Sequence, residues 1–486
     1  MRIAGLRTAG VVALAALSGF MVDAIAAGQA GDFCLDCLEI RVGPPTVVRG
    51  PSYDELDAVF SALKLADGSF RGFSANGATY AIEGASLAQL SGPRRAVMDA
   101  GPPGSLNECG RWLTSVARAG DRVLGMVHQE SICKYGPGGQ THKSMAIATS
   151  SDDGLTWTDL GTVITGTQTP QPGSITGEGD CTMIDGLDGY LYAYCLRNTD
   201  WQTIVARAPL CDPTNWHKYY EGGWTEPGLG GRSTDIGFVG TGAGYLKQPG
   251  LVAAVATDPW FGGLRLSLSE DKVRFADLDE PLLTIDGSDW NRPADTDLIA
   301  YPTIVNPEDG SNAVDPTFVL TYSYVPPGAG FDSRYLVQHE VAMSVRETPP
   351  PVQVGMALTR WRHPQQGIYV TSSGPLTGDR LAYERDTVVA HMLTRAPDGM
   401  ESTRLEECSS QRTGHLDHLL SRDGSCESGG YSRERTAGWL YASEQPGTVA
   451  VYRCYAADTQ THFASAAADC EGLGTNDALL GYGLAP

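Results

Sequence analysis

Apolar and polar positions alternate with a period of two residues through most of the chain. In the stretch RVLGMVHQESICKYG, residues 122–136, alternate positions carry Leu124, Met126, His128 and Glu130. Successive residues of a strand point to opposite faces, so His128 and Glu130 share one face at the end of a predicted strand. Helical periodicity is nearly absent, and the pattern therefore predicts an all-β fold.

Strand pairs joined by turns recur along the chain. The pairs are RWLTSVARAGDRVLGMVH, CTMIDGLDGYLYAYC, DIGFVGTGAGYLKQPGLVAAVAT and YPTIVNPEDGSNAVDPTFVLTYSY, with Gly, Asp and Pro at the turns. A strand with an acidic turn also repeats, as SDDGLTWTDL from Ser151 and SEDKVRFADL from Ser269. Repeats of this kind, roughly 55 to 75 residues long, are typical of propeller blades. With segments 58–99 and 352–389, they predict a five-bladed β-propeller closed by joining its two ends.

The N-terminus carries the features of an export signal. Arg2 and Arg7 precede an apolar run from Thr8 to Val22, and small residues follow it. This arrangement predicts a Sec-type signal peptide over residues 1–30, because the run is too short to span a membrane. We therefore expect a secreted or periplasmic protein, with attachment to the cell surface left open.

The character of the sequence changes after residue 396, where a second repeat begins. The segment LEECSSQRTGHLDHLLSRDGSCE with AGWLYA is echoed by VYRCYAADTQTHFASAAADCE with LGYGLA. We therefore expect the β-propeller to occupy 31–396 and a small β-rich module of two repeats to occupy 397–486. Binding or attachment is the expected role of this C-terminal module.

The eleven cysteines indicate disulfides, because the chain is expected to be exported. Four pairs are expected, at matching hairpin ends or within one half of the C-terminal repeat: Cys109 with Cys133, Cys181 with Cys195, Cys408 with Cys426, and Cys454 with Cys470. One cysteine of the set is left over, and the sequence does not identify it. A zinc site is disfavoured, since no second close pair joins Cys34 and Cys37.

The charge balance narrows the class of partner. The formal net charge is −22, and the acidic excess is spread along the chain. Phosphates would be repelled, so nucleic acid and anionic membranes are disfavoured as partners. A neutral ligand and a monomeric protein are the expectation.

Carboxylates recur at equivalent strand ends of the predicted hairpins. The start of the first strand and the end of the second lie at one edge of a hairpin, so these residues should gather at one mouth of the propeller. The catalytic candidates are Glu130, Asp180, Asp235 and Glu226, the last depending on how its loop folds. The substrate-binding candidates are Glu108, His128, Tyr135, Arg197, Arg232, Trp260 and Asp297. The alternative is a set of ordinary solvated strand ends.

A ring of carboxylates around a neutral ligand suits cleavage of a glycosidic bond. One protonated acid donates to the leaving oxygen, and one carboxylate activates water or attacks the sugar. Crowding of like charges raises one pKa and leaves a partner ionised. The sugar, the linkage, the stereochemical outcome and the role of each carboxylate stay open, as does the rival of a non-catalytic lectin or adhesin. No cofactor is expected, with calcium kept as an alternative at the acidic mouth.

Short motifs carry a resemblance to known enzymes. SSDDGLTW, residues 150–157, matches the Asp-box of sialidases and related propellers, and HQE, GEGD and WTEPG surround it. Together they resemble the five-bladed glycoside hydrolases of the arabinanase, fructosidase and mannoside-phosphorylase group. That resemblance implies chemistry by Glu130, Asp180 and either Asp235 or Glu226.

Two further comparisons follow from motifs. The three-arginine cluster and Tyr–Glu pair expected of a true sialidase are not evident, so sialic acid is disfavoured as a substrate. The C-terminal module resembles a repeat domain of unknown function in secreted bacterial proteins, through YRCY, HF, CE and LGY. This second resemblance implies export and no particular reaction.

Overall fold

The structure is a computed structural model, and strands dominate it. It describes residues 33–34, 37–53, 55–135, 139–257, 263–278, 281–284, 298–326, 328–330, 332–346, 354–374, 376, 383–410, 417–424, 426–428 and 430–486. Within these ranges the regular elements are β-strands and two short 3-10 turns, which confirms the all-β class. No helix among the described residues is long and apolar enough to cross a membrane.

The first sheets follow one another along the chain. The four-stranded sheet contains β3 (Ser61–Lys64), β4 (Phe70–Asn76), β5 (Ala78–Gly84) and β6 (Arg95–Met98). The nine-stranded sheet contains β7 (Gly110–Ala119), β8 (Arg122–Lys134), β9 (Gln140–Ser150), β10 (Thr158–Thr165), β11 (Ile175–Asp185), β12 (Tyr190–Arg197), β13 (Gln202–Pro209), β14 (His217–Tyr220) and β15 (Gly223–Pro227). Its two halves meet through parallel pairing of β9 with β11.

Two more sheets follow before residue 346. The six-stranded sheet contains β16 (Gly242–Leu246), β17 (Leu251–Thr257), β18 (Gly263–Ser269), β19 (Ala276–Asp277), β20 (Leu283–Thr284) and β22 (Ala313–Val314). The five-stranded sheet contains β21 (Leu298–Val305), β23 (Thr317–Val325), β24 (Arg334–Val345), β1 (Leu38–Val42) and β2 (Thr46–Ser52). All the predicted strand pairs are confirmed, namely β7 with β8, β11 with β12, β16 with β17, and β21 with β23.

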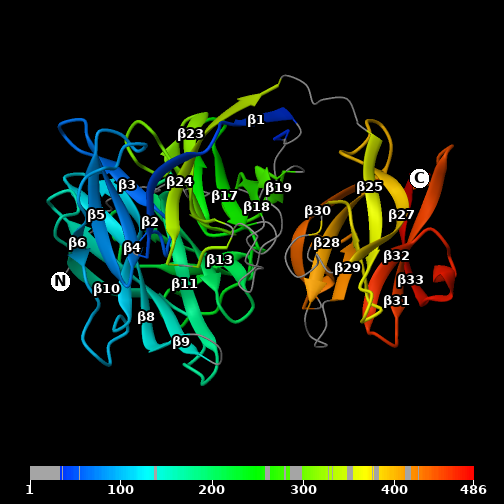
Figure 1. Ribbon diagram of the computed structural model, residues 1–486, viewed down its shortest axis with the longest axis horizontal. Helices are drawn as coiled ribbons and strands as arrows, with labels where there is room; N and C mark the ends of the chain where they lie inside the picture. Colours follow the sequence, from blue (N-terminus) through cyan, green and yellow to red (C-terminus); the bar gives the residue numbers. More distant parts are fainter. Residues whose placement is uncertain are drawn as a thin grey trace, which may run out of the picture. The chain divides into compact units, whose positions relative to one another are not determined.

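The two ends of this region join, although not through the segments that the sequence suggested. β1 and β2 run antiparallel to β24 (Figure 1), with Leu38 opposite Val345 and Thr46 opposite Gln338. The N-terminal segment 58–99 instead forms a sheet of its own, β3 to β6. The strands of 352–389 pair elsewhere, so their predicted place in the closing blade is wrong.

A separate nine-stranded sheet forms the C-terminal part. It contains β25 (Val354–Arg362), β26 (Tyr369–Ser372), β27 (Glu384–Leu393), β28 (Ser402–Ser410), β29 (Asp417–Ser421), β30 (Ser432–Tyr441), β31 (Thr448–Ala456), β32 (Thr461–Ser465) and β33 (Thr475–Leu484). β27 pairs with β30 and β33, and Leu358 and Met392 share a core with Leu440 and Leu480. The expected boundary at 396/397 therefore falls inside one sheet and one core.

Five disulfides cross-link the described chain. They are Cys34–Cys37, Cys109–Cys133, Cys181–Cys195, Cys408–Cys426 and Cys454–Cys470. The four expected pairs are confirmed. The cysteine left over is Cys211, which is exposed. A disulfide set of this size is typical of proteins from oxidising compartments.

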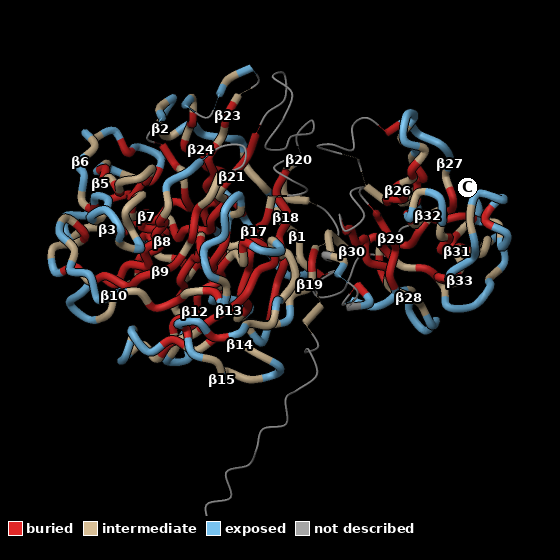
Figure 2. The backbone as a smooth tube through the Cα atoms, turned by 90° about the horizontal axis from the view of Figure 1, so that it is seen from below, coloured by how far each residue is buried: buried red, intermediate tan, exposed pale blue. Residues whose placement is uncertain are grey.

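Buried positions follow the strands and exposed positions follow the turns (Figure 2). The turn between β9 and β10 shows how one such connection is held. Asp152 Oδ1 accepts the backbone N–H groups of Leu155 and Thr156, and Trp157 Nε1 donates to the Gly154 carbonyl. Gly154 has φ +86°, and a Cβ there would lie 2.4 Å from the Phe73 ring. Glycine is therefore required on both backbone and packing grounds.

Candidate active site

Strand pairing brings Glu130, Lys143 and Asp180 together. Glu130 lies near the end of β8, opposite Gly110 at the start of β7 and opposite Lys143 on β9. Lys143 also pairs with Gly177 at the start of β11, the strand that carries Asp180. A lysine on the third strand of one unit thus lies between two carboxylates. Its Nζ is 2.8 Å from Asp180 Oδ2 and 3.6 Å from Glu130 Oε1.

Two β-bulges aim side chains toward the same region. The pairing of β11 with β12 shifts register between Gly179 and Thr182, and that of β21 with β23 shifts between Ala300 and Thr303. Within these shifts, Asp180 has φ +54° and Tyr301 has φ +53°. Left-handed backbone is uncommon for residues other than glycine and costs of order 1–3 kcal/mol. Bulges of this kind re-aim side chains at sites.

His128 connects the backbone of Asp180 to the side chain of Glu130, and its hydrogen bonds fix which ring nitrogen carries the proton. The backbone N–H of Asp180 donates to His128 Nδ1 at 2.9 Å, so Nδ1 accepts and carries no proton. The proton therefore sits on Nε2, which lies 3.1 Å from Glu130 Oε1 and donates to it. The second oxygen of Glu130 accepts the Tyr135 hydroxyl at 2.8 Å. The expected sharing of a face by His128 and Glu130 is confirmed as a direct hydrogen bond.

Asp57, just ahead of β3, is a carboxyl group that the sequence analysis missed. Arg334 Nη2 on β24 lies 2.9 Å from Asp57 Oδ1, and the Tyr301 hydroxyl lies 3.4 Å from the same oxygen. Oδ2 has no hydrogen-bond partner among the described residues, and the side chain is 27% exposed. The charges of Glu130 and Asp180 both act on this carboxyl. We use the name carboxyl cluster for Asp57, Glu130 and Asp180.

The environment drives the pKa values of the carboxyl cluster apart. Burial raises the pKa of Asp57, and the nearby charges of Glu130 and Asp180 raise it further against the opposing Arg334. Burial also acts to raise the pKa of Glu130, but the hydrogen bond from His128 and the Lys143 charge outweigh it and lower that pKa to about 2. The pKa of Asp180 is lowered too, since Lys143 outweighs its burial. Asp57 therefore holds its proton to a higher pH than an ordinary aspartate does, whereas Glu130 and Asp180 lose theirs at a lower pH than usual.

The low pKa of Glu130 predicts a loss of stability in acid. A carboxyl whose folded pKa lies below its ordinary value near 4.5 stabilises the fold above that value, and this contribution is lost as the pH falls from about 4.5 toward 2. The full contribution is roughly 3 kcal/mol. Urea unfolding at pH 5 and pH 3 should show a smaller acid loss in Glu130→Gln than in the unchanged protein. Equal losses in both proteins would contradict the assignment.

A second buried ion pair lies on the same strand as Asp180. Glu178 Oε2 is 2.6 Å from Lys218 Nζ on β14, and both side chains are fully or almost fully buried. Lys218 also donates to the Thr165 and Gly231 carbonyls, at 2.8 and 2.7 Å. Burial raises the pKa of Glu178 and lowers that of Lys218. This pair holds the loop 228–235 against β10 and β11.

Several predicted site residues lie in contacts of their own. Glu226 is paired with Arg232 at 2.7 Å, and Arg197 bonds Asp200 at 2.5 Å and Asp235 at 3.4 Å. Among the described residues, no hydrogen bond or ion pair joins Glu226 or Asp235 to the carboxyl cluster. Their predicted catalytic role has no geometric support.

Three predicted substrate-binding residues remain. The structure describes Glu108 and does not describe the other two. Glu108 accepts the backbone N–H groups of Gly104 and Ile132, at 2.7 and 2.8 Å, which holds the turn before β7 against the end of β8. These hydrogen bonds lower its pKa. Trp260 and Asp297 lie outside the described residues.

The motifs did not reveal a tyrosine–glutamate contact, but the structure contains one, because Tyr135 donates to Glu130. The cations do not favour an anionic substrate, however. Lys143 is bound by Asp180, and Arg334 is bound by Asp57. An acidic sugar would also face Glu130 and Asp180, both ionised.

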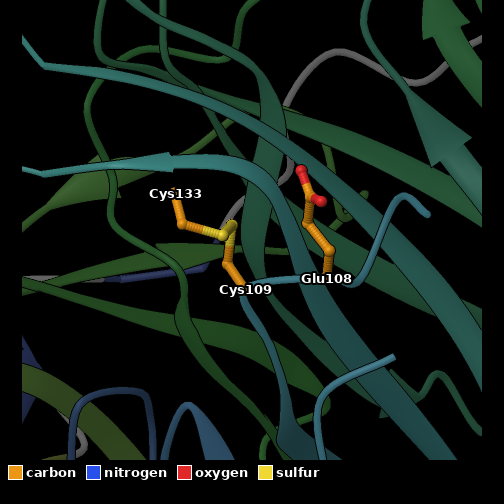
Figure 3. A group of neighbouring side chains, drawn as sticks. All are labelled: Glu108, Cys109 and Cys133. Carbon is orange, nitrogen blue, oxygen red and sulfur yellow. A yellow bond between two sulfur atoms is a disulfide. The ribbon is translucent and has the colours of Figure 1, made fainter. Parts of the chain in front are cut away.

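Two groups of side chains in the described part of the chain lie close enough to share a metal ion. They are Glu108 with Cys109 and Cys133, and Glu407 with His418 and Glu434. In the first group the two sulfur atoms are bonded to each other (Figure 3), so neither is a free thiolate ligand. In the second, Arg435 Nε already lies 3.1 Å from Glu407 Oε2. The calcium alternative at the acidic mouth stays a prediction.

Comparisons with known proteins show weak similarity of backbone fold and no similarity of sequence family. No family model and no curated protein matches the sequence. An α-L-arabinofuranosidase from Lactobacillus brevis is 14% identical, with a TM-score of 0.40 over 60% of this chain and 92% of that one. The catalytic domain of a family 62 α-L-arabinofuranosidase from Coprinopsis cinerea is 12% identical, with a TM-score of 0.40 over 63% and 98%. A family 117 glycoside hydrolase from Zobellia galactanivorans is 10% identical, with a TM-score of 0.41 over 63% and 91%. Likenesses at this level carry no conclusion about activity.

Proposed function

We propose that this chain is a glycoside hydrolase that acts on a neutral oligo- or polysaccharide at the carboxyl cluster. The observation that carries the proposal is the convergence of Asp57, Glu130 and Asp180, which lie far apart in the sequence, with pKa values driven in opposite directions. A protonated acid beside ionised carboxylates is the requirement of glycosidic cleavage.

Each carboxyl suits one role. Asp57 is the proton donor, because its pKa is raised and Oδ2 is open toward a leaving oxygen. Asp180 is the ionised base or nucleophile, since Lys143 binds Oδ2 and leaves Oδ1 without a hydrogen bond among the described residues. Both oxygens of Glu130 are occupied by His128 and Tyr135. Glu130 therefore positions its neighbours and keeps Asp57 protonated.

The wider architecture is part of the proposal. The four-stranded sheet, the two halves of the nine-stranded sheet β7–β15, the six-stranded sheet and the five-stranded sheet serve as five blades, closed by pairing of β1 and β2 with β24. Residues 354–484 then form a separate module for binding or attachment. Export after cleavage of a signal peptide accords with the five disulfides.

A product-release screen tests the activity. The protein would be incubated with neutral aryl glycosides of both anomeric configurations and with soluble galactomannan, arabinoxylan, levan and mixed-linkage glucan, and new reducing ends or aryl alcohol would be measured. Release of product from at least one polysaccharide by the unchanged protein, and very little from it by Asp57→Asn, is the expected result. Saturable binding with no product from any glycan would instead make the protein a lectin or adhesin.

A further inference from the structure

Exposed aromatic side chains are confined to one place in the described part of the chain. Tyr53 is 61% exposed and Tyr135 is 62% exposed, while every other described aromatic side chain is buried or half-buried. Tyr53 lies four positions before Asp57, and Tyr135 follows Glu130 at the end of β8. Large apolar surface left in water on a monomer commonly marks a binding site.

Each of the two tyrosines is connected to a different member of the carboxyl cluster, Tyr53 through its backbone carbonyl and Tyr135 through its hydroxyl group. Arg334 donates to the Tyr53 carbonyl at 3.0 Å and to Asp57 Oδ1 at 2.9 Å, which joins the two residues through one guanidinium. Tyr135 donates directly to Glu130. Burial and Glu130 raise the pKa of Tyr135 most, and the charges of Asp57 and Tyr53 add to the rise, so Tyr53 lies within electrostatic reach of Tyr135.

We propose that Tyr53 and Tyr135 form an aromatic pair that stacks on the sugar rings of a neutral oligosaccharide and holds the bond to be cleaved beside Asp57. This inference rests on the proposed function. Sugar rings present C–H faces that pack against aromatic rings, whereas their hydroxyls need the few polar groups of the site. The pair therefore sets substrate affinity, and the carboxyl cluster performs the chemistry.

The two tyrosines differ in what the hydroxyl group does. The Tyr53 hydroxyl makes no hydrogen bond among the described residues, whereas the Tyr135 hydroxyl holds Glu130. Tyr135→Phe keeps the stacking ring and removes only that bond. Tyr135→Ala removes both. Comparing the two variants separates stacking from positioning of the carboxylate.

The test measures binding and turnover separately in the full chain. The probes are the four soluble polysaccharides named above, used in native affinity gels, together with the aryl glycoside that is cleaved fastest. Tyr53→Ala and Tyr135→Ala should each weaken retention and raise KM by about tenfold. Tyr53→Ala should keep kcat within about threefold, whereas Tyr135→Ala should also lower kcat as far as Tyr135→Phe does, because both remove the hydrogen bond to Glu130. Tyr135→Phe should keep wild-type retention. Tyr220→Ala, whose ring carries Arg232 instead, is the matched control and should bind normally.

The outcomes distinguish this inference from the proposed function. If the unchanged protein binds a glycan without cleaving it and both alanine variants lose that binding, the aromatic pair is supported and the proposed hydrolase activity is overturned. If the unchanged protein cleaves a glycan and both alanine variants keep its KM and retention, the hydrolase activity is supported and the aromatic pair is overturned. Thermal unfolding of each variant verifies that it is folded, which these exposed positions favour.

Discussion

Asp57→Asn should lower kcat on a natural glycoside by about a thousandfold, because the variant cannot donate a proton to the leaving oxygen. The loss should depend on the leaving group. The dinitrophenolate of a dinitrophenyl glycoside is a stable anion and leaves without being protonated. Asp57→Asn should therefore retain far more of its activity on that substrate than on an alkyl glycoside. The measurement is kcat on both substrates for the variant and for the unchanged protein. Thermal unfolding of the variant verifies that it is folded.

Glu226→Gln is the matched control for this experiment. Glu226 is also a carboxylate and a catalytic candidate from the sequence, but it is paired with Arg232 and has no contact with the carboxyl cluster. Its kcat should stay within about threefold of the unchanged protein. A large loss in Glu226→Gln with normal activity in Asp57→Asn would reverse the assignment of the site.

Lys218→Met should lower the free energy of unfolding by about 3–5 kcal/mol, because it leaves Glu178 buried without its counter-charge. Urea unfolding at neutral pH measures the loss. The double variant Glu178→Gln with Lys218→Met should recover a large part of it, since no unpaired charge then remains in the interior.

Lys247→Met supplies the comparison for the buried pair. Lys247 Nζ lies 3.1 Å from Asp315 Oδ2, but both side chains are substantially exposed. Removing this surface pair should change stability by less than about 1 kcal/mol. Equal losses in Lys218→Met and Lys247→Met would show that burial of the Glu178–Lys218 pair has no energetic consequence.

Local pattern was sufficient to predict the strands and their neighbours. Period-two alternation gave the β class, and turn residues between alternating segments gave the hairpins of β7 with β8 and of β11 with β12. Hairpin pairing then placed Cys181 near Cys195 and Cys109 near Cys133, where the disulfides lie. These features depend on residues close together in the sequence.

The residues missed at the site depend on features that alternation does not encode. Lys143 is on β9, a third strand beside the hairpin of β7 and β8, whereas the strand-end pattern involves only the two strands of a hairpin. Asp180 was found by its place at a strand start, but the bulge that orients it, and its counterpart at Tyr301, interrupt the regular period. Asp57 lies four positions ahead of β3 and just before segment 58–99, so a rule based on strand ends does not select it.

The pairing of β1 with β24 fixes the order in which the protein can mature. Leu38 and Val345 are neighbours in the sheet although 345 − 38 = 307 positions separate them. Contacts between such remote positions form slowly, because a long chain must first be brought together. Arg334, which holds Asp57, also lies on β24. A nascent chain that has not yet reached β24 therefore lacks both the strand that pairs with β1 and β2 and the arginine that binds Asp57. The proposed function then requires that no activity appears until nearly all of this region has been synthesised.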